Sequence, residues 1–241
     1  MAQIRTYPDL ERLSRAAAEH FVDLARQAVA DRGRFAVALS GGSTPKSLYA
    51  LLATEEFLRR VDWPRVHVFW GDERCVPPDH VDSSYRMAKE ILLDHVPLPS
   101  EQVYRIRGEI EPALAAAEYD SLLHDFFGEV SGPRFDLLLL GMGDDGHTAS
   151  LFPNTAALNE RERWVVENYV EAKHMWRITL SPPTINAAAN IAFLVSGAEK
   201  AERLRQVLKG DYQPHLLPAQ IVKPVNGHLL WFVDEAAAAL L

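Results

Sequence analysis

The chain has 241 residues, of which 48% are hydrophobic and 24% charged, and its 25 Lys and Arg against 33 Asp and Glu give a formal net charge of −8. This composition is typical of a folded globular protein, and no apolar run approaches the roughly 18–20 residues that span a bilayer, so we expect no membrane partner. The acidic balance argues against a nucleic-acid partner, because phosphate backbones are bound by basic surfaces.

The start of the chain and its cysteine content bear on the cellular compartment and on possible disulfides and metal sites. The first residues form no apolar signal-peptide core and already contain acids, so we expect a cytoplasmic protein. A single cysteine, Cys75, excludes an intrachain disulfide and a cysteine-based zinc cluster. No internal repeat and no linker rich in Gly, Pro or Ser interrupts the chain, so we predict one domain over residues 1–241.

Apolar stretches of strand length alternate with stretches of helical period. Strands that are apolar without alternation are expected where both faces of a parallel sheet are covered. The pattern predicts an α/β fold, with helices on both sides of a mostly parallel sheet. In chain order we predict helix 9–30, strand 35–39, helix 45–53, strand 66–70, helices 83–93 and 112–127, strands 135–140, 164–170, 177–180 and 191–195, helix 198–208 and strand 229–233.

Four of the predicted strands are followed by glycine-rich or polar sequence. In an open parallel sheet, ligands bind beyond the carboxyl ends of the strands, so these junctions are the first candidates for function. If the strands are parallel, the four loops share one edge of the sheet. The junctions are residues 40–45 (SGGSTP), 71–74 (GDER), 141–147 (GMGDDGH) and 196–200 (SGAEK).

The first junction has the features of an anion site. Gly41 and Gly42 let the backbone approach a ligand closely. Thr44 as the N-cap and Pro45 as the first helical residue would turn free N–H groups of a helix start outward. The alternative is a tight turn that binds nothing. The position of Lys46 does not fit a Walker loop.

The third junction contains a literal G-x-G-x-x-G, which by itself suggests a dinucleotide site. Asp144 and Asp145 stand inside it and would repel a pyrophosphate, and no ribose-binding acid follows at the expected distance. His147 beside this acidic pair favours proton transfer, because histidine can act as a base near neutral pH. The alternatives are that His147 only satisfies hydrogen bonds of the loop and that Asp145 caps a following helix.

Three cations are candidates for holding an anion. Lys200 stands in the first turn of a predicted helix, where the helix dipole disfavours a cation and a bound anion would offset that effect. Arg74 and Arg177 suit forked contacts to phosphate. The alternatives are solvent exposure of Lys200 and pairing of the arginines with local acids such as Glu171 or Asp72. Arg177 is the first residue of its predicted strand, so it reaches the sheet edge only if that strand is antiparallel to the others.

Two other chemistries have weaker support. Cys75 could be a nucleophile, but nothing in its surroundings indicates a lowered thiol pKa, and a buried inert thiol is the better interpretation. Asp144, Asp145 and His147 form a poor metal-ligand set, since three nearly adjacent loop residues lack distant partners. We therefore expect no metal and no other cofactor.

Five segments, taken in order, resemble the 6-phosphogluconolactonase family and extend over most of the chain. The resemblance implies a modified Rossmann-like α/β sandwich, related to glucosamine-6-phosphate deaminases and ribose-5-phosphate isomerases, that needs no nucleotide. It also implies hydrolysis of 6-phosphogluconolactone, a sugar phosphate, in the pentose phosphate pathway. The segments are ALSGGSTPKSLY, FWGDERCVPPDHVDSSYRMA, LLGMGDDGHTASLFP, RITLSPPTINAA and VSGAEKA.

The motifs of the family also imply roles for individual positions. They assign the phosphate to the glycine loop, to the arginine of RITL and to the lysine of SGAEK, and they assign the base to the histidine of DGH. The corresponding residues are Gly41, Gly42, Ser43, Arg177 and Lys200 for phosphate, His147 with Asp145 beside it for proton transfer, and Asp72 and Arg74 for the cavity wall.

The closest alternative is the deaminase, which shares the phosphate loop and the D-G-H triplet. Its segment after the histidine ends in Asn-Glu-Pro, whereas here Phe152 stands at the place of the glutamate and cannot take a proton. Opening a lactone needs mainly one activated water and a stabilised oxyanion, for which Arg74 or an N–H of the 141–146 loop is a candidate. Asp145 or Asp72 would orient the base. A sugar-phosphate-binding module without catalysis is the third hypothesis.

Overall fold

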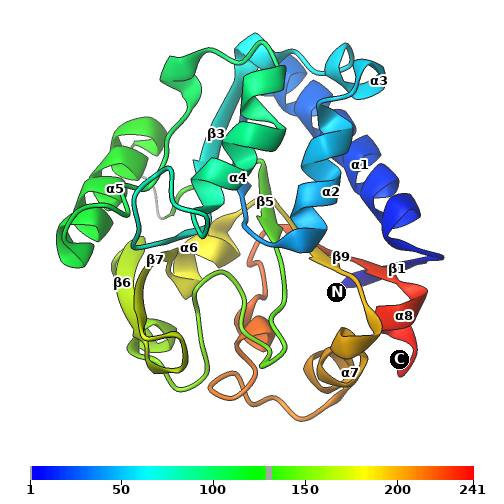
Figure 1. Cartoon of the computed structure of the whole chain (residues 1–241), viewed down its shortest axis with the longest axis vertical. Helices are drawn as coiled ribbons and strands as arrows, with labels where there is room; N and C mark the ends of the chain where they lie inside the picture. Colours follow the sequence, from blue (N-terminus) through cyan, green and yellow to red (C-terminus); the bar gives the residue numbers. More distant parts are fainter. Residues whose placement is uncertain (1, 129–131) are drawn as a thin grey trace.

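The central sheet of the molecule has six strands, and every neighbouring pair is parallel (Figure 1). The structure is a computed structural model that describes residues 2–128 and 132–241. The predicted α/β fold with a parallel sheet is confirmed. In spatial order the strands are β1 (Gln3–Tyr7), β9 (His228–Asp234), β8 (Asn190–Val195), β5 (Leu137–Leu140), β2 (Phe35–Leu39) and β3 (Val66–Trp70).

Helices cover both faces of this sheet. The first of them, α1 (Leu10–Arg32), shows how local sequence sets an element: the Asp9 side chain accepts a hydrogen bond from the N–H of Arg12, and the helix ends at Gly33 with a φ of 73°. The apolar stripe of α1 packs against α2 and the sheet. The other helices are α2 (Ser43–Leu52), α3 (Glu55–Leu58), α4 (Ser84–Ile91), α5 (Pro112–Phe127), α6 (Pro182–Ala187), α7 (Ala201–Lys209) and α8 (Glu235–Ala238).

A second, antiparallel sheet joins β4 (Asp72–Arg74), β7 (Met175–Leu180) and β6 (Val165–Val170). The strands predicted near 164–170 and 177–180 therefore do not belong to the parallel sheet. Two strands were not predicted at all: β1 has four exposed residues and thus no apolar run, and β4 is a short polar segment directly after β3. β4 begins only two residues after the end of β3, and its partner β7 runs antiparallel to it.

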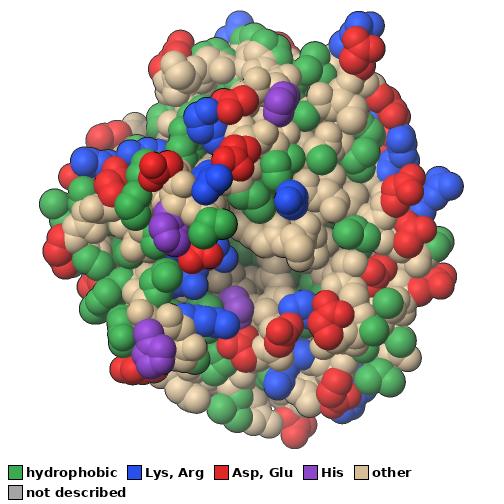
Figure 2. Space-filling model, viewed as in Figure 1, with side chains coloured by type: hydrophobic (Ala, Val, Ile, Leu, Met, Phe, Trp, Pro, Cys, Tyr) green, Lys and Arg blue, Asp and Glu red, His purple; other side chains and the backbone are tan. Residues whose placement is uncertain are grey.

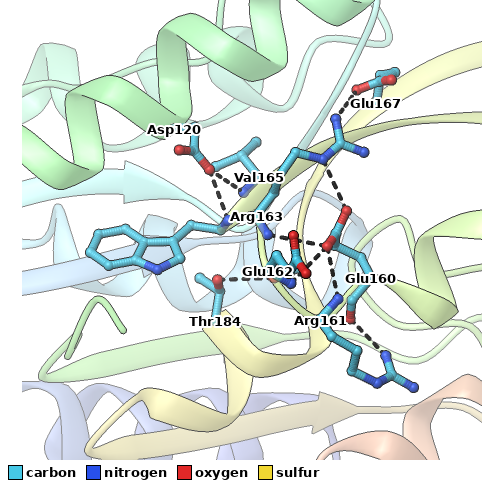
Figure 3. Close-up of polar contacts among 10 residues, drawn as sticks. Asp120, Glu160, Arg161, Glu162, Arg163, Val165, Glu167 and Thr184 are labelled. Carbon is cyan, nitrogen blue, oxygen red and sulfur yellow. Dashed lines mark hydrogen bonds and ion pairs between the residues drawn. The ribbon is translucent and has the colours of Figure 1, made fainter. Parts of the chain in front are cut away.

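The start of β6 is held by carboxylates (Figure 3). Asp120 of α5 accepts the N–H groups of Trp164 and Val165 at 2.8 and 2.9 Å. Glu160 accepts the N–H groups of the next three residues and the Nε of Arg163. These bonds tie the antiparallel sheet to α5, and so they set where β7 presents its side chains.

The order of the parallel strands reverses between β2 and β5. From β2 the chain moves outward to β3 and later returns to the opposite side of β2 through β5. The loops that follow β2 and β5 therefore diverge, and such a switch point opens a crevice at the carboxyl ends of the strands. The first and last strands pair at the other edge, where both termini lie (Figure 1). Over the described residues, no helix combines the length and the apolar character that a membrane span requires.

Candidate active site

A cavity of about 340 Å³ lies at this switch point, within the range of about 300–1,000 Å³ that is usual for small-molecule sites. All four predicted junctions contribute to its wall, which confirms that they share one edge of the sheet. Figure 2 shows the hollow, with charged side chains along its edges. The site residues predicted from sequence that line it are Gly41, Gly42, Ser43, Asp72, Arg74, His147, Arg177 and Lys200.

His147 and Asp145 form a hydrogen-bonded pair. The Asp145 Oδ1 lies 2.6 Å from His147 Nδ1 and also accepts the His147 N–H at 3.0 Å. Burial opposes ionisation of Asp145, but the hydrogen bonds and charge of His147 outweigh it and lower the carboxyl pKa to about 2. An ionised Asp145 can only accept, so Nδ1 carries the proton of this hydrogen bond and Nε2 is the ring nitrogen that can take up a further proton. No helix follows Asp145, and the helix-cap alternative is thus wrong.

Two further residues shape the position of the His147 ring. Phe152, which is 4% exposed, stacks on it with the ring centroids 3.9 Å apart and the planes at 18°. Gly143 underlies it so closely that a Cβ there would lie 2.0 Å from His147 Nδ1. The second glycine of the G-x-G-x-x-G pattern therefore provides space for an imidazole. From the sequence, Phe152 is recognisable only as the replacement of an acid, because ring stacking leaves no spacing pattern in the chain.

Asp72 does not contact the histidine. Its buried carboxylate accepts the Ser150 hydroxyl at 2.6 Å, and the Ser150 N–H donates to the Thr179 hydroxyl at 3.2 Å. Between the two acids considered for orienting His147, the structure places Asp145 on the ring and Asp72 in the cavity wall. Asp72 can therefore meet a substrate with its remaining oxygen lone pairs.

The glycine loop begins its helix earlier than predicted. The cap position is Gly42, with a φ of 110°, and α2 starts at Ser43, so Thr44 and Pro45 lie inside its first turn. A glycine is suited to that backbone conformation, because a side chain would be strained there. The N–H groups of the first turn still face the cavity end of the helix.

Packing around the glycine loop explains why residue 41 is a glycine and identifies Ser40 as a further candidate site residue. A Cβ on Gly41 would lie 2.5 Å from the Ser84 Oγ at the start of α4, so the loop can approach α4 only without one. Ser40 exchanges both its backbone hydrogen bonds with the Tyr49 hydroxyl. Ser40 lines the cavity, and its buried Oγ has no partner among the described residues. Ser40 is therefore a candidate donor to a ligand that no motif in the sequence indicates.

Arg74 and Arg177 lie opposite each other on β4 and β7. The antiparallel orientation of β7 brings Arg177 to the cavity, which meets the condition set by the sequence. Burial, followed by the charge of Arg74, lowers the pKa of Arg177 from its usual value, and neither arginine forms an ion pair within the part of the chain described here. Arg74 donates instead to the Asp82 carbonyl and approaches Gly41.

Glu73, between Asp72 and Arg74 on β4, organises the segment behind Arg74. Its carboxylate is 2% exposed and accepts four hydrogen bonds, from the N–H groups of Arg74, Ser84 and Tyr85 and from the Ser83 hydroxyl. Burial raises the carboxyl pKa, and the four donors counteract that effect. Glu73 thus joins β4 to the start of α4 beside the glycine loop.

Two lysines complete the wall. Lys200 is the last residue of the short 3₁₀ turn Ala198–Lys200 that precedes α7, whereas the sequence predicted it in the first turn of a longer helix. Its side chain forms an ion pair with Asp144. Lys173, from the turn between β6 and β7, also lines the cavity and was not predicted, because only the hairpin brings it there. With the two arginines, four cationic side chains and one acidic side chain, Asp72, line the cavity of a protein of net charge −8. The cavity therefore favours an anion.

Other reactive groups are less suited to chemistry. Burial raises the pKa of the half-buried Cys75 thiol to about 11, which favours the inert-thiol interpretation. Within residues 2–128 and 132–241, no group of three or more His, Cys, Asp or Glu side chains is placed to hold a metal ion.

Comparison with known proteins is consistent with this site. Residues 8–231 match the model of the family described as glucosamine-6-phosphate isomerases/6-phosphogluconolactonase. The chain is 44% identical over 217 residues to the 6-phosphogluconolactonase of a Nostoc species, covering 89% of this chain and 88% of that one. It is 41% identical over 214 residues to the Synechocystis 6-phosphogluconolactonase, covering 88% and 86%. The solved 6-phosphogluconolactonase of Trypanosoma cruzi superimposes with a TM-score of 0.88 at 28% identity, covering 100% of this chain and 97% of that one.

Proposed function

The chain belongs to the family of glucosamine-6-phosphate isomerases and 6-phosphogluconolactonases, and we propose that it hydrolyses 6-phospho-D-glucono-1,5-lactone to 6-phospho-D-gluconate in the pentose phosphate pathway, with His147 activating the water. The observation that carries the proposal is that one cavity contains both a cluster of cationic side chains and an imidazole whose Nδ1 is hydrogen-bonded to an ionised carboxylate. Such a site binds a phosphorylated substrate and moves one proton.

The phosphate binds at the glycine loop. Gly41, Gly42 and Ser43 offer backbone N–H groups at the start of α2, and Arg177 and Lys200 supply charge. Arg74 approaches Gly41, so it belongs with this phosphate-binding end and not with the reacting carbonyl. The lactone ring then extends toward His147, past Asp72, whose carboxylate accepts a hydrogen bond from a sugar hydroxyl.

The chemistry needs one base that later serves as an acid. The Nε2 of His147 takes a proton from water, the water oxygen attacks the lactone carbonyl, and a tetrahedral oxyanion forms. Asp145 holds the ring and stabilises the imidazolium. Protonated His147 then gives its proton to the ring oxygen as the ester bond breaks, which yields the open-chain acid. The oxyanion is held by N–H groups of the 141–146 loop other than those of Gly143 and Gly146, which are bonded within the loop.

The other activity of the family, isomerisation with loss of ammonia, requires more proton transfers than this site supports. The position of the second acid is occupied by Phe152, which is stacked on the His147 ring. An apolar ring there can orient the imidazole but cannot relay a proton. The stacking therefore favours the lactonase over the deaminase.

The direct test offers the purified protein 6-phosphogluconolactone and glucosamine 6-phosphate in separate assays. We expect acid release from the lactone well above its uncatalysed rate and no ammonia release from the amino sugar. Ammonia release would overturn the assignment in favour of the deaminase. Tight binding of the lactone without turnover would support a binding module instead.

Two variants separate the base from the phosphate grip. His147→Ala should lower kcat by about 10²- to 10⁴-fold, the usual contribution of a general base, and leave the Kd for inorganic phosphate unchanged. Arg177→Ala should mainly raise KM, through loss of a charged hydrogen bond of about 1.5–3 kcal/mol. Steady-state kinetics with phosphate-binding calorimetry measures both. Undiminished turnover of the histidine variant would exclude it as the base.

A further inference from the structure

The lysine that we propose to bind the phosphate, Lys200, is paired with a carboxylate of the protein itself. Lys200 Nζ forms an ion pair with the Asp144 carboxylate. The two side chains differ in exposure: that of Lys200 is 20% exposed, whereas that of Asp144 is 79% exposed. The lysine is therefore confined to the cavity wall, while the aspartate lies at the surface and can rotate into solvent.

The backbone of Asp144 is fixed even though its side chain is not. Its carbonyl accepts the Arg203 Nε of α7 at 2.9 Å, and the next residue, Asp145, holds His147. The Gly143 N–H donates to the His147 carbonyl at 2.9 Å, which closes the loop around the histidine. A movement of the Asp144 carboxylate away from Lys200 therefore requires only side-chain rotation and leaves the catalytic pair in place.

We infer that Asp144 is a further residue that sets substrate affinity: its carboxylate competes with the substrate phosphate for Lys200. This inference rests on the proposed function, in which Lys200 binds the phosphate. When the phosphate enters, Asp144 gives up the ammonium group and turns to solvent. When the phosphorylated product leaves, Asp144 takes the ammonium group back, so the product is not held by an unpaired cation.

The electrostatics of the loop support this role. Lys200 lowers the pKa of Asp144, so the carboxylate is ionised wherever the enzyme meets a phosphate dianion. An ion pair with an exposed carboxylate is weak and changes an equilibrium constant by at most a few-fold. The binding free energy of a phosphate at Lys200 can therefore offset the loss of this pair. The same charge also repels a neighbouring phosphate. Both effects act in one direction and weaken phosphate binding.

The test is the affinity of the full-length protein for inorganic phosphate and for 6-phosphogluconate, measured by titration calorimetry. Asp144→Asn removes the competing charge at constant size, and we expect both Kd values to fall by about two- to fivefold. Asp144→Glu keeps the carboxylate and should retain the parent affinities. Asp125→Asn, on the exposed surface of α5, removes the same unit of charge far from the cavity and should leave both Kd values unchanged.

Salt separates charge competition from a change of shape. At about 1 M NaCl, where the screening length falls to about 3 Å, the advantage of Asp144→Asn should shrink toward none. In steady-state assays the same variant should lower KM for the lactone. An unchanged or larger phosphate Kd in Asp144→Asn would overturn the inference, since it would mean that Asp144 positions Lys200 for binding. If the protein bound phosphate more tightly on this substitution but did not hydrolyse the lactone, the proposed function would fail and the competition would stand.

Discussion

The imidazole of His147 is positioned by three contacts that come from its own segment of chain. Asp145 bonds its Nδ1, Phe152 stacks on its ring, and Gly143 supplies the space that it occupies. None of the three contacts involves the glycine loop, Arg177 or Lys200, where we propose that the phosphate binds. At the residue scale, orientation of the base and affinity for the phosphate should therefore respond to different substitutions.

Gly143→Ala tests the orientation of the base. The new Cβ would lie 2.0 Å from His147 Nδ1 and 2.9 Å from Asp145 Oδ1, so the ring must move. We expect kcat for the lactone to fall by about 10²-fold, the usual effect of a displacement of roughly 1 Å at a reacting group. The Kd for inorganic phosphate should stay unchanged.

Gly141→Ala is the matched control in the same loop, because a Cβ there meets no atom within 4 Å. The measurement is the NMR signal of the His147 Nδ1 proton in its bond to Asp145. This signal should be retained in Gly141→Ala and lost or shifted in Gly143→Ala. Equal behaviour of the two variants would show that the ring is not held by its contact with Gly143.

At the scale of the elements, helix α4 begins where Glu73 of β4 binds its first N–H groups. The carboxylate accepts four hydrogen bonds in a buried setting, and the segment it fixes also carries the Asp82 carbonyl that anchors Arg74. One side chain thereby joins a strand, a helix start and an arginine that lines the cavity. The contact between Gly41 and Ser84 extends this junction to the glycine loop.

Glu73→Gln should lower the free energy of unfolding by about 2–4 kcal/mol, because the amide nitrogen would face donors that then lack an acceptor. It should also raise KM, since Arg74 loses its anchor. Urea denaturation and steady-state kinetics measure the two effects. Glu90→Gln, on the exposed face of the same helix, removes only the pair with Arg86 and should cost about 0.5 kcal/mol or less. Similar losses in both variants would contradict the role of Glu73.

At the scale of the whole molecule, several carboxylates ionise more readily in the folded protein than in the unfolded chain. The Arg105 side chain lowers the pKa of Glu109 to about 2. The pKa of Glu160 is also about 2, because the hydrogen bonds that it accepts outweigh its burial. An unfolded glutamate titrates near about 4.3, so these groups stabilise the fold above that pH.

Acid should therefore unfold the protein through these groups. Their contribution is complete at neutral pH, declines as the pH falls below about 4.3, and is lost as it passes the folded pKa values near 2. Urea midpoints measured from neutral pH to about pH 2 should fall over this window. In Glu160→Gln the fall should be smaller, whereas Glu55→Gln, whose side chain is 88% exposed, should follow the parent protein. A parent midpoint independent of pH over this window would contradict the assignment.

The sequence alone determined the α/β class, the central strands and the four junctions, because these depend on local patterns. The runs FAVAL and LLLL are apolar throughout, and glycines and polar residues follow them directly. The positions named from the family's motifs line the cavity or, in the case of Asp145, hold the histidine that does. These features can be predicted from the sequence because a strand buried on both faces appears as a short apolar run, and the loop at its end appears as glycine and polar residues directly after that run.

Only the tertiary structure decided how these parts meet. The docking of the β6–β7 hairpin, which carries Arg177 and Lys173 to the cavity, depends on pairing between segments about a hundred residues apart, such as Asp72 with Thr179. The stacking of Phe152, the burial of Glu73 and the pairing of Lys200 with Asp144 are likewise contacts in space. Such contacts have no period or spacing in the chain, because they arise from packing across elements that the order of residues does not place side by side.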